Sequence, residues 1–444
     1  MVSKIIPRLI LTWVISSVLL VTLTACGSDK KNPRLRGERL SILTSEGDIE
    51  VDETLANFPV SLPQPYVNDN WGQPGGNTSN VLHHLALADT LTQVWKTDIG
   101  DGSKNYEKLV SGPVYWNGVL YIIDTDATVS AIDGDNGRRL WRTELEDEDE
   151  KSNVAYGGGV SYWNGRIFAT TGFGFAVGLD ASTGEELWRA DIGVPLRGGP
   201  TVSKGNVYVH TQDNQLIALD ADDGEVIWEH FAIVENAEVL GNSSPAIDGD
   251  TVIAAFSSGE LYALRSANGQ VSWQDALSRT GRLTALATLN DIDGHPVIYN
   301  GRVYVGNHSG RLLSIDLRSG ERVWESNIGT LYTPWIAGNY MFVLNTEGEL
   351  VNLSIRDGRV RWISQLQRFE KQKKRKGLIR WAGPVLAGDR LFVVSSHGYM
   401  LTVSPYTGEI LSGIKLPAPA VIPPIVVNQT VYLLTDKGDL IAYR

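Results

Sequence analysis

The residues that could perform acid–base or metal chemistry do not form a recognisable site. The seven histidines are scattered, and the chain has no Gly-x-Ser-x-Gly, phosphate-loop or His-Glu-x-x-His motif. His308 and His397 occupy the same position of a repeated segment. Other copies have Ser258, Glu347 and Lys437 there. A position that accepts any polar residue is typical of a solvated turn, and His210 is interpreted as a packed strand residue. We therefore predict no catalytic, cofactor or metal site.

Two charged runs are further candidates for binding. The acidic run 144–150 lacks the alternating ligands and the turn glycine of a calcium loop, so we interpret it as a charged loop. A basic run lies within residues 363–382. It contains Lys371, Lys373, Lys374, Arg375 and Lys376. This run is either a solvated loop or an electrostatic contact with an acidic partner.

The single cysteine, Cys26, offers a different chemistry. It follows a basic start with Lys4 and Arg8, an almost wholly apolar run over 9–25, and the small residues Thr24 and Ala25. The pattern resembles a bacterial lipobox, in which the cysteine is acylated with palmitate or a similar chain and becomes the new N-terminus. An uncleaved membrane anchor with an incidental cysteine is the alternative. We predict a signal peptide over 1–25 and a lipid anchor on Cys26.

The position of the anchored protein follows from the residue after the cysteine and from the composition. Gly27 follows Cys26, where Asp would favour retention in the inner membrane, so we expect the periplasmic face of the outer membrane. The formal net charge is −12, and removal of residues 1–25 lowers it by two more. Such an acidic body is unsuited to nucleic acid and to broad adsorption on anionic lipid. Residues 26–85 show no repeat and are predicted to be the lipidated N-terminus and a flexible tether, which could be ordered near Trp71.

Residues 86–444 contain an internal repeat built from three signals in a fixed order. The first is a Pro or small residue followed by an apolar stretch and a turn Gly, as in Pro200 to Gly205. The second is a five-residue strand such as Leu216 to Asp220, and the third is Gly-x-x-x-Trp. The first two signals occur eight times. The period of about 45 residues suits a four-stranded propeller blade.

The tryptophans of the third signal predict how the ring closes. They are Trp141, Trp188, Trp228, Trp273, Trp324 and Trp362, while the seventh copy has Ser412. An equivalent residue, Trp95, stands before the first repeat instead of after the last. We therefore predict an all-β, eight-bladed propeller of four-stranded antiparallel blades, closed by the N-terminal strand. The tryptophans are expected to pack between neighbouring blades.

The segment from Tyr208 to Trp228 resembles the repeat of pyrroloquinoline-quinone dehydrogenases, and this resemblance covers about residues 90–444. The same repeat occurs in the BamB family of outer-membrane assembly lipoproteins. This chain resembles the BamB family more than the dehydrogenases in three features. It lacks a second cysteine, its blades are close to minimal, and it has a lipobox. This resemblance implies a non-enzymatic scaffold of the β-barrel assembly complex that binds a BamA-like subunit. A periplasmic quinoprotein dehydrogenase or quinone-binding sensor is the alternative, because Asn70-Trp71-Gly72-Gln73 resembles the start of some quinoprotein domains.

Loops between blades are the expected partner surface, because function on a propeller usually lies where loops vary over a rigid scaffold. The longest of these loops are 229–243, 274–294 and 363–382. The BamB resemblance implies that two of the loops contact the BamA-like subunit. The matching positions are Ala237, Val239, Leu240, Asp291 and Asp293. The family commonly has an Arg beside the first group, and this chain has none there, so an apolar contact is expected.

Overall fold

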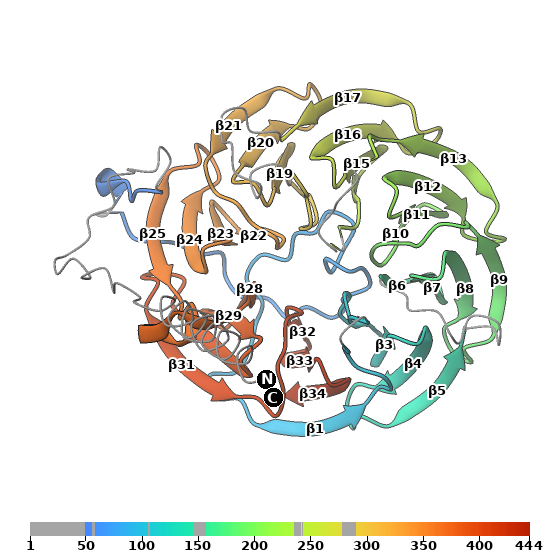
Figure 1. Cartoon of the computed structure of the whole chain (residues 1–444), viewed down its shortest axis with the longest axis horizontal. Coiled ribbons are helices and arrows are strands. Elements are labelled where there is room, and N and C mark those ends of the chain that lie inside the picture. Colours follow the sequence, from blue (N-terminus) through green and yellow to red (C-terminus); the bar gives the residue numbers. More distant parts are fainter. Residues whose placement is uncertain are drawn as a thin grey trace, which may run out of the picture. The chain divides into compact units, whose positions relative to one another are not determined.

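The computed structural model describes residues 49–55, 58–104, 107–145, 157–234, 241, 243–277 and 290–444. Within residues 49–444 the strands form eight four-stranded antiparallel sheets, arranged around a ring (Figure 1). The fold class predicted from the repeats is therefore confirmed. Among the described residues, no helix combines the length and the apolar composition needed to cross a membrane.

The first four blades follow one another along the chain, each running from an inner to an outer strand. Blade 1 consists of β2 (Val114–Trp116), β3 (Val119–Ile123), β4 (Thr128–Asp133) and β5 (Arg139–Glu144). Blade 2 consists of β6 (Gly158–Trp163), β7 (Arg166–Thr171), β8 (Phe175–Asp180) and β9 (Glu186–Asp191). Blade 3 consists of β10 (Thr201–Ser203), β11 (Asn206–His210), β12 (Gln215–Asp220) and β13 (Val226–Phe231). Blade 4 consists of β14 (Ala246–Asp248), β15 (Thr251–Ala255), β16 (Glu260–Arg265) and β17 (Val271–Ala276).

The remaining blades continue this order. Blade 5 consists of β18 (Val297–Tyr299), β19 (Arg302–Gly306), β20 (Leu312–Asp316) and β21 (Arg322–Ser326). Blade 6 consists of β22 (Trp335–Ala337), β23 (Tyr340–Leu344), β24 (Glu349–Ser354) and β25 (Val360–Gln365). Blade 7 consists of β28 (Trp381–Ala387), β29 (Arg390–Ser395), β30 (Tyr399–Val403) and β31 (Ile410–Lys415). Blade 8 takes β32 (Ile425–Val427), β33 (Thr430–Leu434) and β34 (Asp439–Tyr443) from the end of the chain.

The outer strand of blade 8 comes from the other end of the described chain. It is β1 (Gln93–Asp98), which pairs antiparallel with β34 and places Trp95 opposite Ala442. Figure 1 shows β1 at the rim beside β34, between blade 7 and blade 1. Closure by the N-terminal strand is therefore confirmed. It removes the free sheet edges that an open ring would expose.

The tryptophans of the repeat join each blade to the next. The outer strands expose most side chains, but the central Trp of β13, Trp228, is buried. Each indole Nε1 of the seven tryptophans donates a hydrogen bond of 2.8 to 3.1 Å to a carbonyl oxygen in the following blade. Each ring also covers a turn glycine of that blade, such as Gly224 beneath Trp188, where a Cβ would lie 2.5 Å from the ring. The predicted packing between blades is thus confirmed.

The blade 7 to blade 8 junction differs for a topological reason. In the other blades, the turn joining the third and fourth strands supplies both the carbonyl and the glycine. Blade 8 has no such turn, because its third strand is β34 and its fourth is β1. A tryptophan on β31 would have no equivalent partner, and Ser412 stands there instead, with its hydroxyl 2.7 Å from that of Thr402.

A segment preceding β1 lines the inside of the ring. Residues 66–88, here called the inner belt, run past the inner strands of the blades in the order 8, 1, 2, 3, 4, 5, 6 and 7. The belt residues and their contacts in that order are Asn68 with Val426, Trp71 with Tyr115, Gly72 with Tyr162, Gln73 with Val202, Thr78 with Ile247, Ser79 with Ile298, His83 with Trp335 and Leu85 with Leu386. The belt therefore forms hydrogen bonds with every blade.

The inner belt also closes on itself. The backbone N–H of Tyr66 donates to the carbonyl of His84 at 3.1 Å, and that of Ala86 donates to the carbonyl of Tyr66 at 2.7 Å. Trp71 and Leu85 are buried in the hydrophobic core. Residues 66–85 belong to the segment that we interpreted as a tether that could be ordered near Trp71, and in the structure the ordered part extends along the whole belt. The belt binds mainly through backbone groups and short polar side chains, so its sequence has the composition of a coil.

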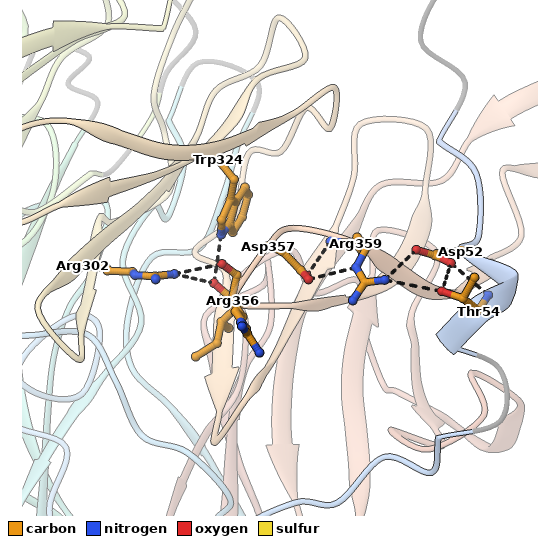
Figure 2. Close-up of polar contacts among 8 residues, drawn as sticks. Asp52, Thr54, Arg302, Trp324, Arg356, Asp357 and Arg359 are labelled. Carbon is orange, nitrogen blue, oxygen red and sulfur yellow. Dashed lines mark hydrogen bonds and ion pairs between the residues drawn. The ribbon is translucent and has the colours of Figure 1, made fainter.

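Residues just before the belt cross blade 6. The backbone N–H of Asp52 donates to the carbonyl of Val360 at 2.9 Å, beside the short helix η1 (Glu53–Leu55). Figure 2 shows Arg359 between Asp52 and Asp357, 3.2 and 2.9 Å from their carboxylates. The same view shows the indole N–H of Trp324 in blade 5 donating to the carbonyl of Ile355 in blade 6, which is the inter-blade contact described above. Residues 49–55 are thereby fixed on β25, the outer strand of blade 6.

We expect the inner belt to stabilise the ring against unfolding. Because Tyr66 and Leu85 form a parallel bridge, replacement of residues 67–84 by about twelve glycines and serines removes the belt contacts and still lets the chain return to Leu85. Several buried backbone groups of the inner strands then lose their partners, at about 1–3 kcal/mol each. The urea midpoint of unfolding should fall clearly, as followed by circular dichroism. For a chain that lacks residues 49–61 instead, the urea midpoint should fall much less. Equal midpoints for the two variants would contradict a role of the belt in stability.

Candidate functional site

The connections between blades lie on the same face of the ring as the turns between second and third strands, and we call this the loop face. The structure describes both ends of the two predicted partner loops: 229–234, 241 and 243 of the first, and 274–277 and 290–294 of the second. Ala237, Val239 and Leu240 lie outside the described residues. The site is therefore built from the residues that flank them.

Asp291 and Asp293 lie below the surface, with 1 % and 4 % of their surface exposed. A carboxylate oxygen of Asp293 is 3.6 Å from Nη2 of Arg197, a buried residue of the connection between blades 2 and 3. Gly241 fits closely against this pair, since a Cβ there would lie 1.7 Å from Asp293 Oδ1 and 3.0 Å from Arg197 Nη2. The Arg197–Asp293 pair thus brings three successive connections together. Neither aspartate faces solvent, and the side chain of Asp293 contacts both Arg197 and the backbone at Gly241.

A chain of hydrogen bonds holds the starts of four successive blades on the loop face. Ser244 donates from its hydroxyl to the carbonyl of Gly199 at 2.6 Å and from its backbone N–H to Nδ1 of His295 at 2.8 Å. The N–H of His295 donates to the hydroxyl of Thr333 at 3.0 Å. Each of these residues directly precedes the proline that begins an inner strand. The network therefore makes the loop face a rigid platform from blade 3 to blade 6.

Two buried histidines of this platform are held neutral. Burial lowers the pKa of His210 and of His295 to about 4. His210 accordingly carries its proton on Nδ1, which donates to the carbonyl of Ser243 at 2.9 Å. Nδ1 of His295 accepts the Ser244 N–H, so its proton lies on Nε2. His210 is a packed strand residue, as predicted.

Exposed apolar side chains lie where the first partner loop leaves β13. The exposed fractions of Phe231, Ile233 and Val234 are 62 %, 61 % and 66 %. The backbone beneath them is fixed, because the N–H of Ile233 donates to Glu260 and its carbonyl accepts from Asn214, both at 2.8 Å. A fixed backbone that presents three apolar side chains to solvent is typical of an interaction surface.

The other sequence candidates do not join this site. Glu144 ends β5, and residues 146–150 of the acidic run lie outside the described residues. The basic run forms a hairpin between blades 6 and 7. His397 is exposed and 3.3 Å from Glu370 of that hairpin. Within the described part of the chain, no group of three or more His, Cys, Asp and Glu side chains is arranged to hold a metal ion.

Comparison with known proteins decides between the families that share this repeat. The chain matches the family described as "Outer membrane protein assembly factor BamB" over residues 84–164, 125–364 and 366–444. It belongs to the BamB family. The relative from Legionella pneumophila is 32 % identical over 84 % of this chain and 91 % of its own length. The relative from Salmonella typhimurium is 29 % identical over 74 % of this chain and 82 % of its own length.

Solved structures with the same fold include both classes of protein considered from the sequence. BamB from Moraxella catarrhalis superposes with a TM-score of 0.68 at 21 % identity, covering 80 % of this chain and all of that one. A quinohemoprotein alcohol dehydrogenase from Comamonas testosteroni superposes with a TM-score of 0.64 at 14 % identity, covering 84 % and 80 %. These similarities show a shared fold, and the sequence relatives are assembly factors named BamB.

Three parts of the site were missed by sequence reasoning. Arg197 precedes both partner loops by more than thirty residues, so no local sequence pattern linked Arg197 to Asp293. The platform had a signal, because Ser244, His295 and Thr333 are polar residues directly before the repeat prolines. Phe231 ends β13, and nothing in the local sequence distinguishes it from the apolar residues that are common on the other outer strands.

The neutral histidines predict a pH-dependent stability. Their pKa in the unfolded chain is about 6.5, so the unfolded state binds more protons between pH 6.5 and 4. Stability is therefore fully present above pH 6.5 and falls as the pH falls to 4, by up to about 3 kcal/mol per histidine. His295→Asn, whose oxygen replaces Nδ1 as acceptor, should weaken this loss in urea titrations between pH 7 and 4.5. Identical pH profiles for the unmodified protein and for His295→Asn would contradict the assignment.

Proposed function

We propose that the protein is a non-enzymatic, lipid-anchored scaffold of the outer-membrane β-barrel assembly complex. Membership of the BamB family supports the complex, and the lipobox at Cys26 supports the anchor at the periplasmic face. The partner is a BamA-like barrel subunit. A quinone-dependent dehydrogenase activity of the purified protein would contradict this proposal.

The partner surface is centred on the first partner loop. The observation that carries this assignment is the exposure of Phe231, Ile233 and Val234 on a backbone fixed by Asn214 and Glu260. Ala237, Val239 and Leu240 follow a few residues later in the sequence, and their contact with the partner stays a prediction. Such a centre with a polar rim is the usual plan of a protein interface. Asp291 and Asp293 act indirectly, because Asp293 and Arg197 hold the ends of both loops.

Substitution of the apolar centre should separate binding from folding. We expect Ile233→Asp with Val234→Asp to weaken co-purification with the BamA-like subunit by about tenfold or more, as for hot-spot residues. Both side chains are exposed, so the circular dichroism spectrum and the urea midpoint should change little.

The matched control is Ile410→Asp with Leu411→Asp on the outer strand of blade 7. These residues are 50 % and 52 % exposed and carry the same change in charge and apolarity. They should leave co-purification unchanged. If both double variants bind the subunit equally well, the partner surface lies elsewhere on the ring.

Anchorage at Cys26 has a separate test. The unmodified protein should incorporate labelled palmitate and remain with the outer-membrane fraction, because two or more acyl chains hold a protein firmly. Cys26→Ser should abolish both the label and the membrane retention. Palmitate uptake by the Cys26→Ser variant would show that the anchor is attached elsewhere.

A further inference from the structure

A basic hairpin rises from the connection between blades 6 and 7. It consists of β26 (Phe369–Lys371), the turn η3 (Gln372–Lys374) and β27 (Lys376–Leu378). Its tip carries five positive side chains and no acidic one. These are Lys371, Lys373, Lys374, Arg375 and Lys376, and all five are exposed. None of them has an ion pair with another residue that the structure describes.

The hairpin is fixed at its base. The N–H of Ile379 donates to the carbonyl of Arg368, and the indole of Trp381 donates to the carbonyl of Gln367, both at 2.8 Å. Ile379 and Trp381 are buried in the core that blade 6 shares with blade 7. A preorganised hairpin loses little conformational freedom on binding, so its charges are available at low cost.

The charge arrangement within the hairpin is unfavourable without an external anion. Lys371 and Lys376 stand directly opposite each other in the β26–β27 pair, and like charges in that position destabilise a sheet. The nearby acidic groups contact residues outside the tip, since Glu347 is 2.6 Å from Arg368 and Glu370 is 3.3 Å from His397. The tip therefore presents unneutralised positive charge to an anionic surface.

Apolar side chains accompany this charge. Leu378 is 63 % exposed and pairs across the hairpin with Phe369. Cations beside exposed apolar groups suit the boundary between lipid headgroups and acyl chains, where each finds its preferred environment.

The hairpin also lies on the blade that receives the N-terminal segment. Asp52 is hydrogen-bonded to Val360 at the start of β25, and the hairpin follows the other end of this strand. Twenty-two residues separate Cys26 from Ile49. If Cys26 is acylated as proposed above, the chain enters the ring from the membrane anchor at blade 6, and the hairpin continues from the same blade. We propose that the hairpin β26–β27 binds anionic lipid headgroups of the membrane.

The acidic body of the protein does not prevent such local binding. Charges further from the membrane than about 8 Å are largely screened at physiological ionic strength, so the tip acts almost alone. Each basic residue near an anionic surface contributes about fivefold in affinity. Binding of the hairpin should therefore be measurable and should weaken strongly with added salt.

Vesicle flotation tests this proposal without the acyl chains. The chain over residues 26–444 with Cys26→Ser is mixed with vesicles of phosphatidylcholine alone, or of equal parts phosphatidylcholine and phosphatidylglycerol. We expect binding to the anionic vesicles only, decreasing with salt. Lys373→Glu, Lys374→Glu and Arg375→Glu together should weaken it by at least about tenfold. The assay is independent of acylation, so its failure is distinct from failure of the palmitate test.

A control variant has the same change in charge at other exposed positions. It combines Arg138→Glu, Arg265→Glu and Arg318→Glu, and its affinity for the anionic vesicles should stay within about twofold of the unmodified chain. Circular dichroism verifies the fold of both variants. Equal binding of the two variants, or equal binding of the unmodified chain to both vesicle types, would overturn the proposal. Loss of co-purifying protein from the hairpin variant with unchanged vesicle binding would also overturn it and would favour an acidic protein partner.

Discussion

The hydrogen bond from an indole N–H to a carbonyl of the next blade is the contact on which this ring depends. It recurs at seven junctions with nearly the same length, and each indole ring also lies on a turn glycine. The glycines have φ between +67° and +78°, which favours glycine, and a Cβ there would collide with the ring. The packing of each tryptophan on a turn glycine therefore fixes the positions of both residue types in every blade. Their regular spacing makes the repeat visible in the sequence.

The junction without this contact is stabilised by other means. Blades 7 and 8 are consecutive along the chain, and the hydrogen-bonded pairing of β1 with β34 joins blade 8 to the strand that leads into blade 1. The inner belt then adds backbone hydrogen bonds to every blade, including Asn68 to blade 8 and Leu85 to blade 7. A ring closed at its rim and along its inner wall opens only if both sets of contacts break.

The sequence predicted those parts of the molecule that repeat. The tryptophans, the turn glycines and the displaced Trp95 have a fixed period, so the blades and their closure followed from it. The inner belt could not be predicted in this way, because Gly72, Thr78 and Ser79 bind through their carbonyls and any residue supplies a carbonyl. The burial of Asp293 depends on Arg197, which lies almost a hundred residues earlier and contacts it only after two blades have formed. Contacts of this kind leave no local pattern.

The rigid ring carries two separate proposed binding surfaces. The apolar residues Phe231, Ile233 and Val234 follow the outer strand of blade 3, whereas the basic hairpin follows that of blade 6. Three blades separate these positions, and Figure 1 shows β13 and β25 on well-separated parts of the rim. A partner bound at the first surface therefore leaves the second free. Because the Trp contacts and the platform from Gly199 to Thr333 prevent the blades from shifting, the orientation of one surface determines that of the other.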